Sequence, residues 1–222
     1  MQKVPNDSLE PTHYKWDSII AFSLMHVGAV GAFFTFSWPA FWVFFTLQWL
    51  TGALGICLCY HRLLTHRSFE VWKPLEYLMA VLGCIAWQNG PIKWVAIHRL
   101  HHARSDRPND PHSPTKGFWW AHMGWLLSFD EELDNYERYS SYAPDLARDP
   151  VYRLLNKTHG LWSLILTLFL FLWGGWPFVF WGFFSEPSLC GTPPGWSTPQ
   201  PICGATEPGP RMTSPPITGG SP

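Results

Sequence analysis

Uncharged apolar residues form two long runs near the start of the chain. Residues 18–36 and 40–60 contain no charged side chain, and Ser37-Trp38-Pro39 separates them. Each run is close to the roughly 20 residues that cross the hydrocarbon core of a bilayer. Proline interrupts a helix, and tryptophan favours the membrane–water interface. The pattern therefore predicts two transmembrane helices joined as an antiparallel hairpin.

Two further apolar stretches follow. Residues 75–86 are apolar but too short for a span, which indicates a buried or interfacial segment. Residues 161–184 are again uncharged, and the Gly-Gly-Trp-Pro sequence at 174–177 predicts a turn within them. We expect most of one span before this turn and the start of another after it. His26 lies inside the first run, where we expect a neutral, hydrogen-bonded histidine packed between helices.

These patterns divide the chain into three parts. Residues 1–17 form a polar N-terminal segment, residues 18–184 a membrane domain, and residues 185–222 a tail that holds 10 of the 21 prolines. Proline and glycine at this density without a period predict disorder in the tail. Most charged residues lie between 61 and 160, which indicates an aqueous cap. The fold class predicted is an all-α integral membrane protein with helical hairpins, a helical cap that carries the histidines and a disordered tail.

Composition supports a membrane location. Aromatic residues make up 17% of the chain, including 15 tryptophans, whereas charged residues make up only 14%. Such aromatic residues commonly line membrane interfaces. The net charge of -1 argues against a nucleic-acid partner, which needs a basic surface. Membrane lipids are the expected surroundings.

Histidines gather where the apolar runs meet the cap. His61 and His66 follow the second run, and His98, His101 and His102 are spaced i, i+3 and i+4, which places them on one face of a helix. Neutral imidazoles are suitable ligands for Fe, Zn, Cu and Ni. The five histidines are therefore candidate ligands of a transition metal.

The spacing of the first pair raises a geometric question. Five residues place His61 and His66 about 140° apart on an ideal α-helix. They can bind one ion only if the helix bends, or they can serve two ions beside it. His112 and His122 are interpreted as structural or supporting residues rather than primary ligands.

The paired histidine motifs resemble the first two histidine boxes of integral-membrane fatty acid desaturases of the stearoyl-CoA (delta-9) type. The resemblance covers roughly residues 15–184. Further agreement comes from five short motifs, namely Gln88-Asn89-x-Pro91, Trp94, Asp110-Pro111-His112, Lys116-Gly117-Phe118 and His122-x-Gly124-Trp125-Leu126-Leu127.

This resemblance implies a mushroom-shaped fold with four spans, a cytosolic helical cap and a di-iron centre. It implies that iron is bound by His61, His66, His98, His101 and His102. The reaction would introduce a double bond into a saturated fatty acyl chain with O2 and two electrons from ferredoxin or cytochrome b5. The protein would then be a multi-pass membrane enzyme with its active site on the cytoplasmic side.

Two departures from the family pattern change this picture. Members that act on acyl-CoA often carry Arg-Asp before the second box, where this chain has Ala96-Ile97, so acyl-lipid substrates are at least as well supported. The family also continues with a third histidine box, whereas no histidine follows His159. We therefore hypothesise that the reading frame is lost near residue 185, giving a truncated product, and both an active desaturase and an inactive membrane protein remain open. Translation of the other two frames tests this hypothesis.

Two alternatives remain open from the sequence, and a third is not supported. A related membrane fatty acid hydroxylase or ketolase would use the same iron chemistry. A non-enzymatic membrane protein would keep only a partial metal site. A zinc metalloprotease is not supported, because the chain has no His-Glu-x-x-His motif.

Overall fold

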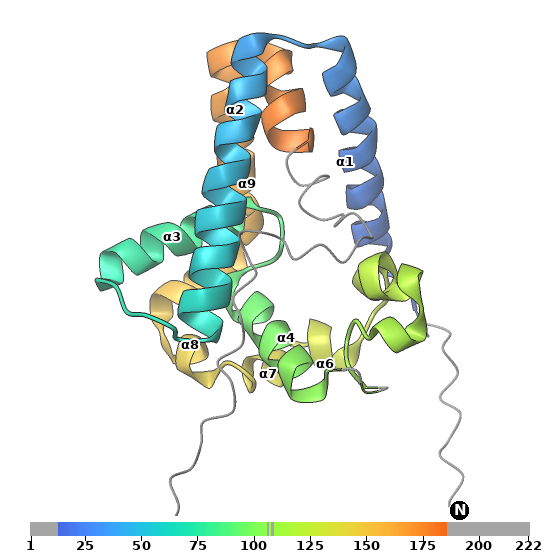
Figure 1. The fold of residues 1–222 in the computed structure, drawn as a ribbon, viewed down its shortest axis with the longest axis vertical. Helices are drawn as coiled ribbons and strands as arrows, with labels where there is room; N and C mark the ends of the chain where they lie inside the picture. Colours follow the sequence, from blue (N-terminus) through green and yellow to red (C-terminus); the bar gives the residue numbers. More distant parts are fainter. Residues whose placement is uncertain (1–12, 106, 108, 186–222) are drawn as a thin grey trace, which may run out of the picture.

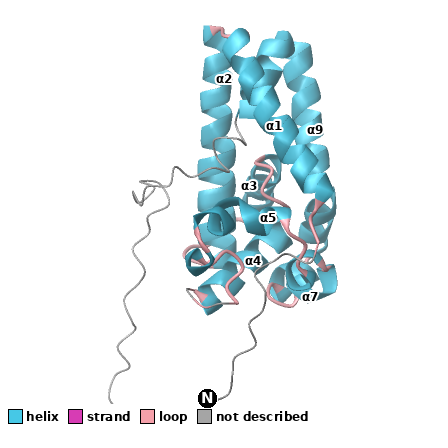
Figure 2. Ribbon diagram, turned by 90° about the vertical axis from the view of Figure 1, so that its right-hand side faces the viewer, coloured by secondary structure: helices cyan, strands magenta, loops and turns pink. Residues whose placement is uncertain are grey.

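Three long helices extend from a cap of shorter helices (Figures 1 and 2). The structure is a computed structural model that describes residues 13–105, 107 and 109–185, and within these residues it contains helices and no named strand. The predicted disorder of the tail beyond residue 185 lies outside the described residues, as does most of the polar N-terminal segment. The all-α prediction is confirmed.

The long helices arise from the uncharged runs. Helix α1 spans Trp16–Phe34, and α2 (Trp38–Gln48) continues without a break into the π-helix η1 (Trp49–Thr65). Ser37 caps α2 by accepting a hydrogen bond from the backbone N–H of Ala40, and Pro39 lies in the first turn, where its missing N–H costs nothing. Helices 16–34, 38–65 and 150–185 are each long and apolar enough to cross a membrane.

The third long helix reverses direction at the predicted turn. Helix α9 (Pro150–Val179) contains Gly175 in a non-helical, positive-φ conformation (φ 66°), which glycine adopts without a steric penalty. Beyond this kink the chain runs through η4 (Phe180–Ser185), which packs against α1 and α2. Gly182 lies against Leu170 of the helix that precedes the turn. The expected start of a further span is therefore present in the described residues.

The cap surrounds the lower ends of these helices. It is built from α3 (Lys73–Ile85), α4 (Pro91–Arg104) and a series of short helices. The short ones are η2 (Pro114–Lys116), η3 (Trp120–Gly124), α5 (Trp125–Leu127), α6 (Glu131–Asp134), α7 (Tyr136–Ser140) and α8 (Pro144–Arg148). The short apolar stretch predicted to be buried or interfacial forms α3, which lies across η1 rather than parallel to it (Figure 1). The core between these helices includes Tyr60, Cys84 and Val95.

Glycine allows η1 and α3 to cross closely. A Cβ atom on Gly55 would lie 2.5 Å from the backbone nitrogen of Gly83, so the two backbones are nearly in contact. Small residues at helix crossings permit such approach in membrane proteins. This crossing fixes the end of η1 that carries His61.

An ionic network connects η1, α4 and α8. Arg99 donates to Asp145 (2.7 Å), to the carbonyl oxygen of Leu64 (2.8 Å) and to that of Tyr142 (3.3 Å). Arg67 donates to the same carboxylate at 2.7 Å. Burial alone would raise the pKa of Asp145, but the hydrogen bonds from the two guanidinium groups outweigh it and hold the pKa well below its usual range. The network therefore connects η1 and α4, the two helices that carry the histidines, to each other and to α8.

The substitution Gly55→Ala should separate η1 from α3. Because the added methyl group meets backbone rather than a flexible side chain, we expect a loss of about 1–3 kcal/mol in the free energy of unfolding. The matched control is Gly160→Ala in α9, where the new Cβ meets no atom within 4 Å. Unfolding in detergent should show a loss for the first variant only; equal stability of both would contradict the close crossing.

The substitution Asp145→Asn should remove the charge that holds the two arginines, at a cost of about 1.5–3 kcal/mol at neutral pH. A lowered pKa in the folded state stabilises the protein above the unfolded value of about 3.9. The difference between wild type and variant should therefore be full above about pH 4 and shrink as the pH falls further. Glu131→Gln is the control, because its pair with Arg138 spans 3.9 Å and is mostly exposed. A pH-independent difference would contradict this account.

Candidate metal centre

The first histidine pair lies on the π-helical end of η1. The backbone N–H of His66 donates to the carbonyl oxygen of His61 at 3.1 Å, an i→i+5 bond that defines π-helical winding. This wider turn brings residues five apart onto one side of the helix, and the two Nε2 atoms lie 3.2 Å apart. The separation of 140° expected for an α-helix is therefore wrong, and the reason is the local winding rather than a bend.

The second pair lies on α4, one turn apart. The Nε2 atoms of His98 and His102 are separated by 3.1 Å, as the i, i+4 spacing allows. Trp94, one turn earlier, stacks on the His98 ring with centroids 4.8 Å apart and an interplanar angle of 30°. Burial, followed by the neighbouring imidazoles, lowers the pKa of His98 to about 2. His98 is therefore neutral at physiological pH, which is the form that binds a metal.

The two pairs face each other. One ligand nitrogen from each of His61, His66, His98 and His102 lies within 4.8 Å of all the others. His61 and His98 are partly buried, and His66 and His102 are exposed on the outer side. Four imidazoles without a carboxylate among them form a donor set that suits a divalent transition metal such as iron or zinc. The donor set therefore fits a metal ion.

The fifth predicted ligand belongs to a neighbouring group. His101 lies with Asp110 and His112 in a second cluster whose ligand atoms are also within 4.8 Å of one another. Its ring centroid is 5.6 Å from that of His102 and 4.1 Å from that of His112. The structure thus brings four of the five histidines together and places the fifth beside them.

Asp110 is the residue that sequence reasoning missed. It was recognised only as part of a shared motif, and His112 was interpreted as structural or supporting. The sequence feature that could have identified Asp110 is its position nine residues after His101, in the polar segment that follows the second histidine motif. Such a contact depends on how the loop returns to the helix, which spacing alone does not give.

The histidine in the first apolar run forms a local contact. His26 is exposed on α1, where Nδ1 lies 2.7 Å from the carbonyl oxygen of Phe22. The expectation of a hydrogen-bonded histidine is therefore met, but the expected packing between helices is wrong. Nδ1 of His122 similarly lies 2.8 Å from the carbonyl oxygen of Phe118, and the imidazole ring of His122 stacks on the phenyl ring of Phe118.

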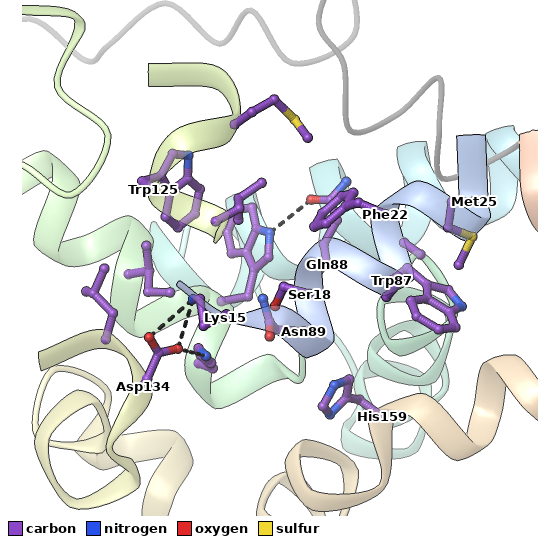
Figure 3. A pocket seen from close by; sticks show the side chains of 18 of the residues that line it. Lys15, Ser18, Phe22, Met25, Trp87, Gln88, Asn89, Trp125, Asp134 and His159 are labelled. Atoms are coloured by element: carbon purple, nitrogen blue, oxygen red, sulfur yellow. Dashed lines mark hydrogen bonds and ion pairs between the residues drawn. The ribbon is translucent and has the colours of Figure 1, made fainter. Parts of the chain in front are cut away.

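A cavity of about 780 Å³ begins at the histidines and extends between α1, α4 and α9 (Figure 3). His98 is the member of the four-histidine group that lines it. Phe22, Met25 and Trp87 contribute apolar walls. Gln88 accepts a hydrogen bond from the indole N–H of Trp94 at 3.1 Å, so this part of the wall is held beside the His98 ring.

Charged groups line the opposite wall of the cavity. Asp134 accepts hydrogen bonds from Lys93 at 2.7 Å and from Lys15 at 3.2 Å (Figure 3). Burial raises the pKa of Asp134, but hydrogen bonds from Lys93 and from the backbone N–H of Asp130 lower it by a larger amount. The pKa of Asp134 is therefore lowered overall. The ionised carboxylate thus joins the start of α1 to α4 and closes one wall of the cavity.

Comparison with known proteins agrees with this geometry. The sequence profile described as fatty acid desaturase matches residues 36–205. An sn-2 palmitoyl-lipid 9-desaturase from Nostoc sp. (strain 36) is 46% identical over 171 residues, which cover 77% of this chain and 60% of that protein. An sn-1 stearoyl-lipid 9-desaturase from Anabaena variabilis is also 46% identical over 171 residues, covering 76% of this chain and 62% of the relative.

A more distant relative is named for a different substrate. Acyl-CoA 5-desaturase AL21 from Anemone leveillei is 42% identical over 172 residues, covering 75% of this chain and 53% of that protein. The chain therefore spans a little over half to about three fifths of the length of these curated relatives. With its helical architecture, its histidine clusters and this profile match, the chain belongs to the fatty acid desaturase family.

Proposed function

We propose that the chain forms the acyl-binding and metal-binding part of a membrane desaturase that introduces a double bond into a saturated acyl chain. The observation that carries the proposal is the meeting of four imidazoles with an apolar cavity at His98. An acyl chain needs apolar walls, whereas the metal needs polar ligands, and this junction provides both. The proposal extends to a di-iron centre with His101 among the ligands.

Iron in this centre would supply the O2-dependent removal of two hydrogens from neighbouring carbons, with O2 reduced to two water molecules by those hydrogens, two electrons and two protons. Ferredoxin or cytochrome b5 is the proposed electron donor. The residues of this chain bind and orient the acyl chain. Trp94 lies between the apolar wall and His98, and Gln88 holds its indole in place. The apolar side chains exclude water from the carbons that react.

Acyl-lipid is the favoured substrate class. The positions that would carry Arg-Asp in many acyl-CoA enzymes are Ala96 and Ile97, which are 0% and 7% exposed. Ile97 packs against Leu133 and lines the cavity. Neither position presents a charge to a CoA head group. The names of the two cyanobacterial relatives, which are lipid desaturases, point the same way.

We also propose a multi-pass topology with the cap on the cytoplasmic side. Helix α1 and the continuous helix 38–65 are joined as a hairpin, which returns the chain to the side where α1 begins (Figure 1). Basic residues gather near the histidines on this side, among them Arg62, Arg67 and Lys93. An excess of Lys and Arg is typical of cytoplasmic membrane loops.

Removal of any one of the four clustered histidines should weaken metal binding. We expect His61→Ala and His98→Ala each to reduce the affinity of the purified chain for Co2+ at least 10-fold, because each removes one nitrogen of the donor set. His26→Ala is the matched control, because Nδ1 of His26 contacts a carbonyl oxygen of its own helix and His26 lies outside the four-histidine group. Equal Co2+ affinity in all three variants and in wild type would contradict the proposed metal centre.

Expression in a host without its own 9-desaturase tests the activity itself. We expect monounsaturated acyl chains in the membrane lipids, and we expect their loss in the His98→Ala variant. Hydroxylated acyl chains would instead support the hydroxylase alternative. A chain that binds metal fully but changes no lipid would support the non-enzymatic alternative and contradict the proposed activity.

A further inference from the structure

Asp110 is a fully buried carboxylate, 0% exposed, in the loop that follows α4. Its two oxygens lie 2.9 and 3.0 Å from Nδ1 of His101. One of them also accepts the backbone N–H of His112 at 3.2 Å. The backbone N–H of Asp110 in turn donates to the carbonyl oxygen of Arg107 at 3.0 Å. The carboxylate is thus held in one place relative to the imidazole.

The chemistry of this contact determines where the proton of His101 lies. A buried carboxylate is stable only when it is hydrogen-bonded, and when ionised it can only accept. Both oxygens of Asp110 lie within hydrogen-bond distance of Nδ1 of His101, and one of them also accepts the backbone N–H of His112, so the carboxylate acts as the acceptor in these contacts. Nδ1 of His101 is therefore the ring nitrogen that donates to Asp110, and Nε2 is the ring nitrogen that Asp110 does not engage.

The neighbouring histidines show why this tautomer matters. In both pairs of the four-histidine group, the Nε2 atoms are the ones that face each other. His101 lies beside that group on the same helix, with its ring centroid 6.2 Å from that of His98. With Nδ1 engaged by Asp110, His101 offers Nε2 as its ligand atom, as the others do.

We propose that Asp110 is a positioning residue that holds His101 with Nδ1 protonated and Nε2 available to a metal ion. This inference rests on the proposed function, in which His101 is a ligand. A carboxylate behind a metal-binding histidine fixes the ring orientation and increases its basicity, and loss of such a partner typically weakens metal binding 10–100-fold. Asp110 thus acts through His101 and does not itself contact the ion.

The test compares four forms of the full chain in detergent: wild type, Asp110→Asn, His101→Ala and the double variant. Each is titrated with Co2+ and followed by visible absorption. In parallel, 15N-histidine NMR spectra, assigned by the loss of one signal in His101→Ala, report the tautomer of His101 directly. Glu76→Gln is the control, because Glu76 is also a buried acid, bonded to Tyr152 and Lys73.

We expect Asp110→Asn and His101→Ala each to weaken Co2+ binding 10–100-fold, and the double variant to be no weaker than His101→Ala alone. The His101 signal should show Nδ1 protonation in wild type and a mixture of tautomers in Asp110→Asn. Glu76→Gln should lower the unfolding temperature without changing the tautomer or the Co2+ affinity, which separates positioning from a general loss of stability.

Three results would overturn the proposal, and they are distinguishable. A further loss of affinity in the double variant would show that Asp110 contacts the ion itself, so that His101, Asp110 and His112 form their own site. Unchanged binding in Asp110→Asn, with a loss in His101→Ala, would remove only the role of Asp110. Unchanged binding in His101→Ala would remove His101 from the proposed centre as well.

Discussion

The structure depends on the winding of η1 where the second membrane run enters the cap. Because the last turns of this helix are π-helical, residues five apart share a side, and His61 and His66 both face α4. An α-helix of the same length would direct one of them away. The two crossings that hold η1 in place, the glycine contact with α3 and the Arg99 hydrogen bond to Leu64, are therefore conditions for the four imidazoles to meet.

The location of the histidines follows from the boundary between apolar and polar surroundings. The cavity between α1, α4 and α9 has apolar side chains on one wall and the Asp134 ion pair on another, and on the cap side Arg99 and Asp145 connect the helices. His98 lies between these regions, partly buried against Trp94 and open to the cavity. In the proposed function, this boundary is where a fatty acyl chain and a metal ion approach each other.

The sequence predicts those parts of the fold that depend on local composition. The uncharged runs, the Pro39 break and the Gly-Gly-Trp-Pro turn each appear where they were expected, because hydropathy and turn chemistry act over a few residues. The short stretch after residue 75 was rightly excluded as a span, but its crossing over η1 depends on Gly55 and Gly83, which are 28 positions apart. His26 was placed between helices, although it lies exposed on α1.

The sequence predicts which histidines are candidate ligands, but it does not predict how they are arranged. The i, i+4 relation of His98 and His102 follows from ordinary helical spacing, whereas the convergence of His61 and His66 requires a π-helix that spacing does not reveal. The separation of His101 toward Asp110 depends on the return of a loop. The hypothesis of a lost reading frame concerns residues beyond 185, which lie outside the described part of the chain.

X-ray absorption spectroscopy of the iron-loaded chain tests the central claim most directly, because imidazole rings bound to iron give a characteristic multiple-scattering signal. If segments 61–66 and 98–102 contribute ligands to the same metal centre, His61→Ala and His98→Ala should each reduce the imidazole contribution by a similar amount. A signal that falls for one segment and is unchanged for the other would contradict a shared centre.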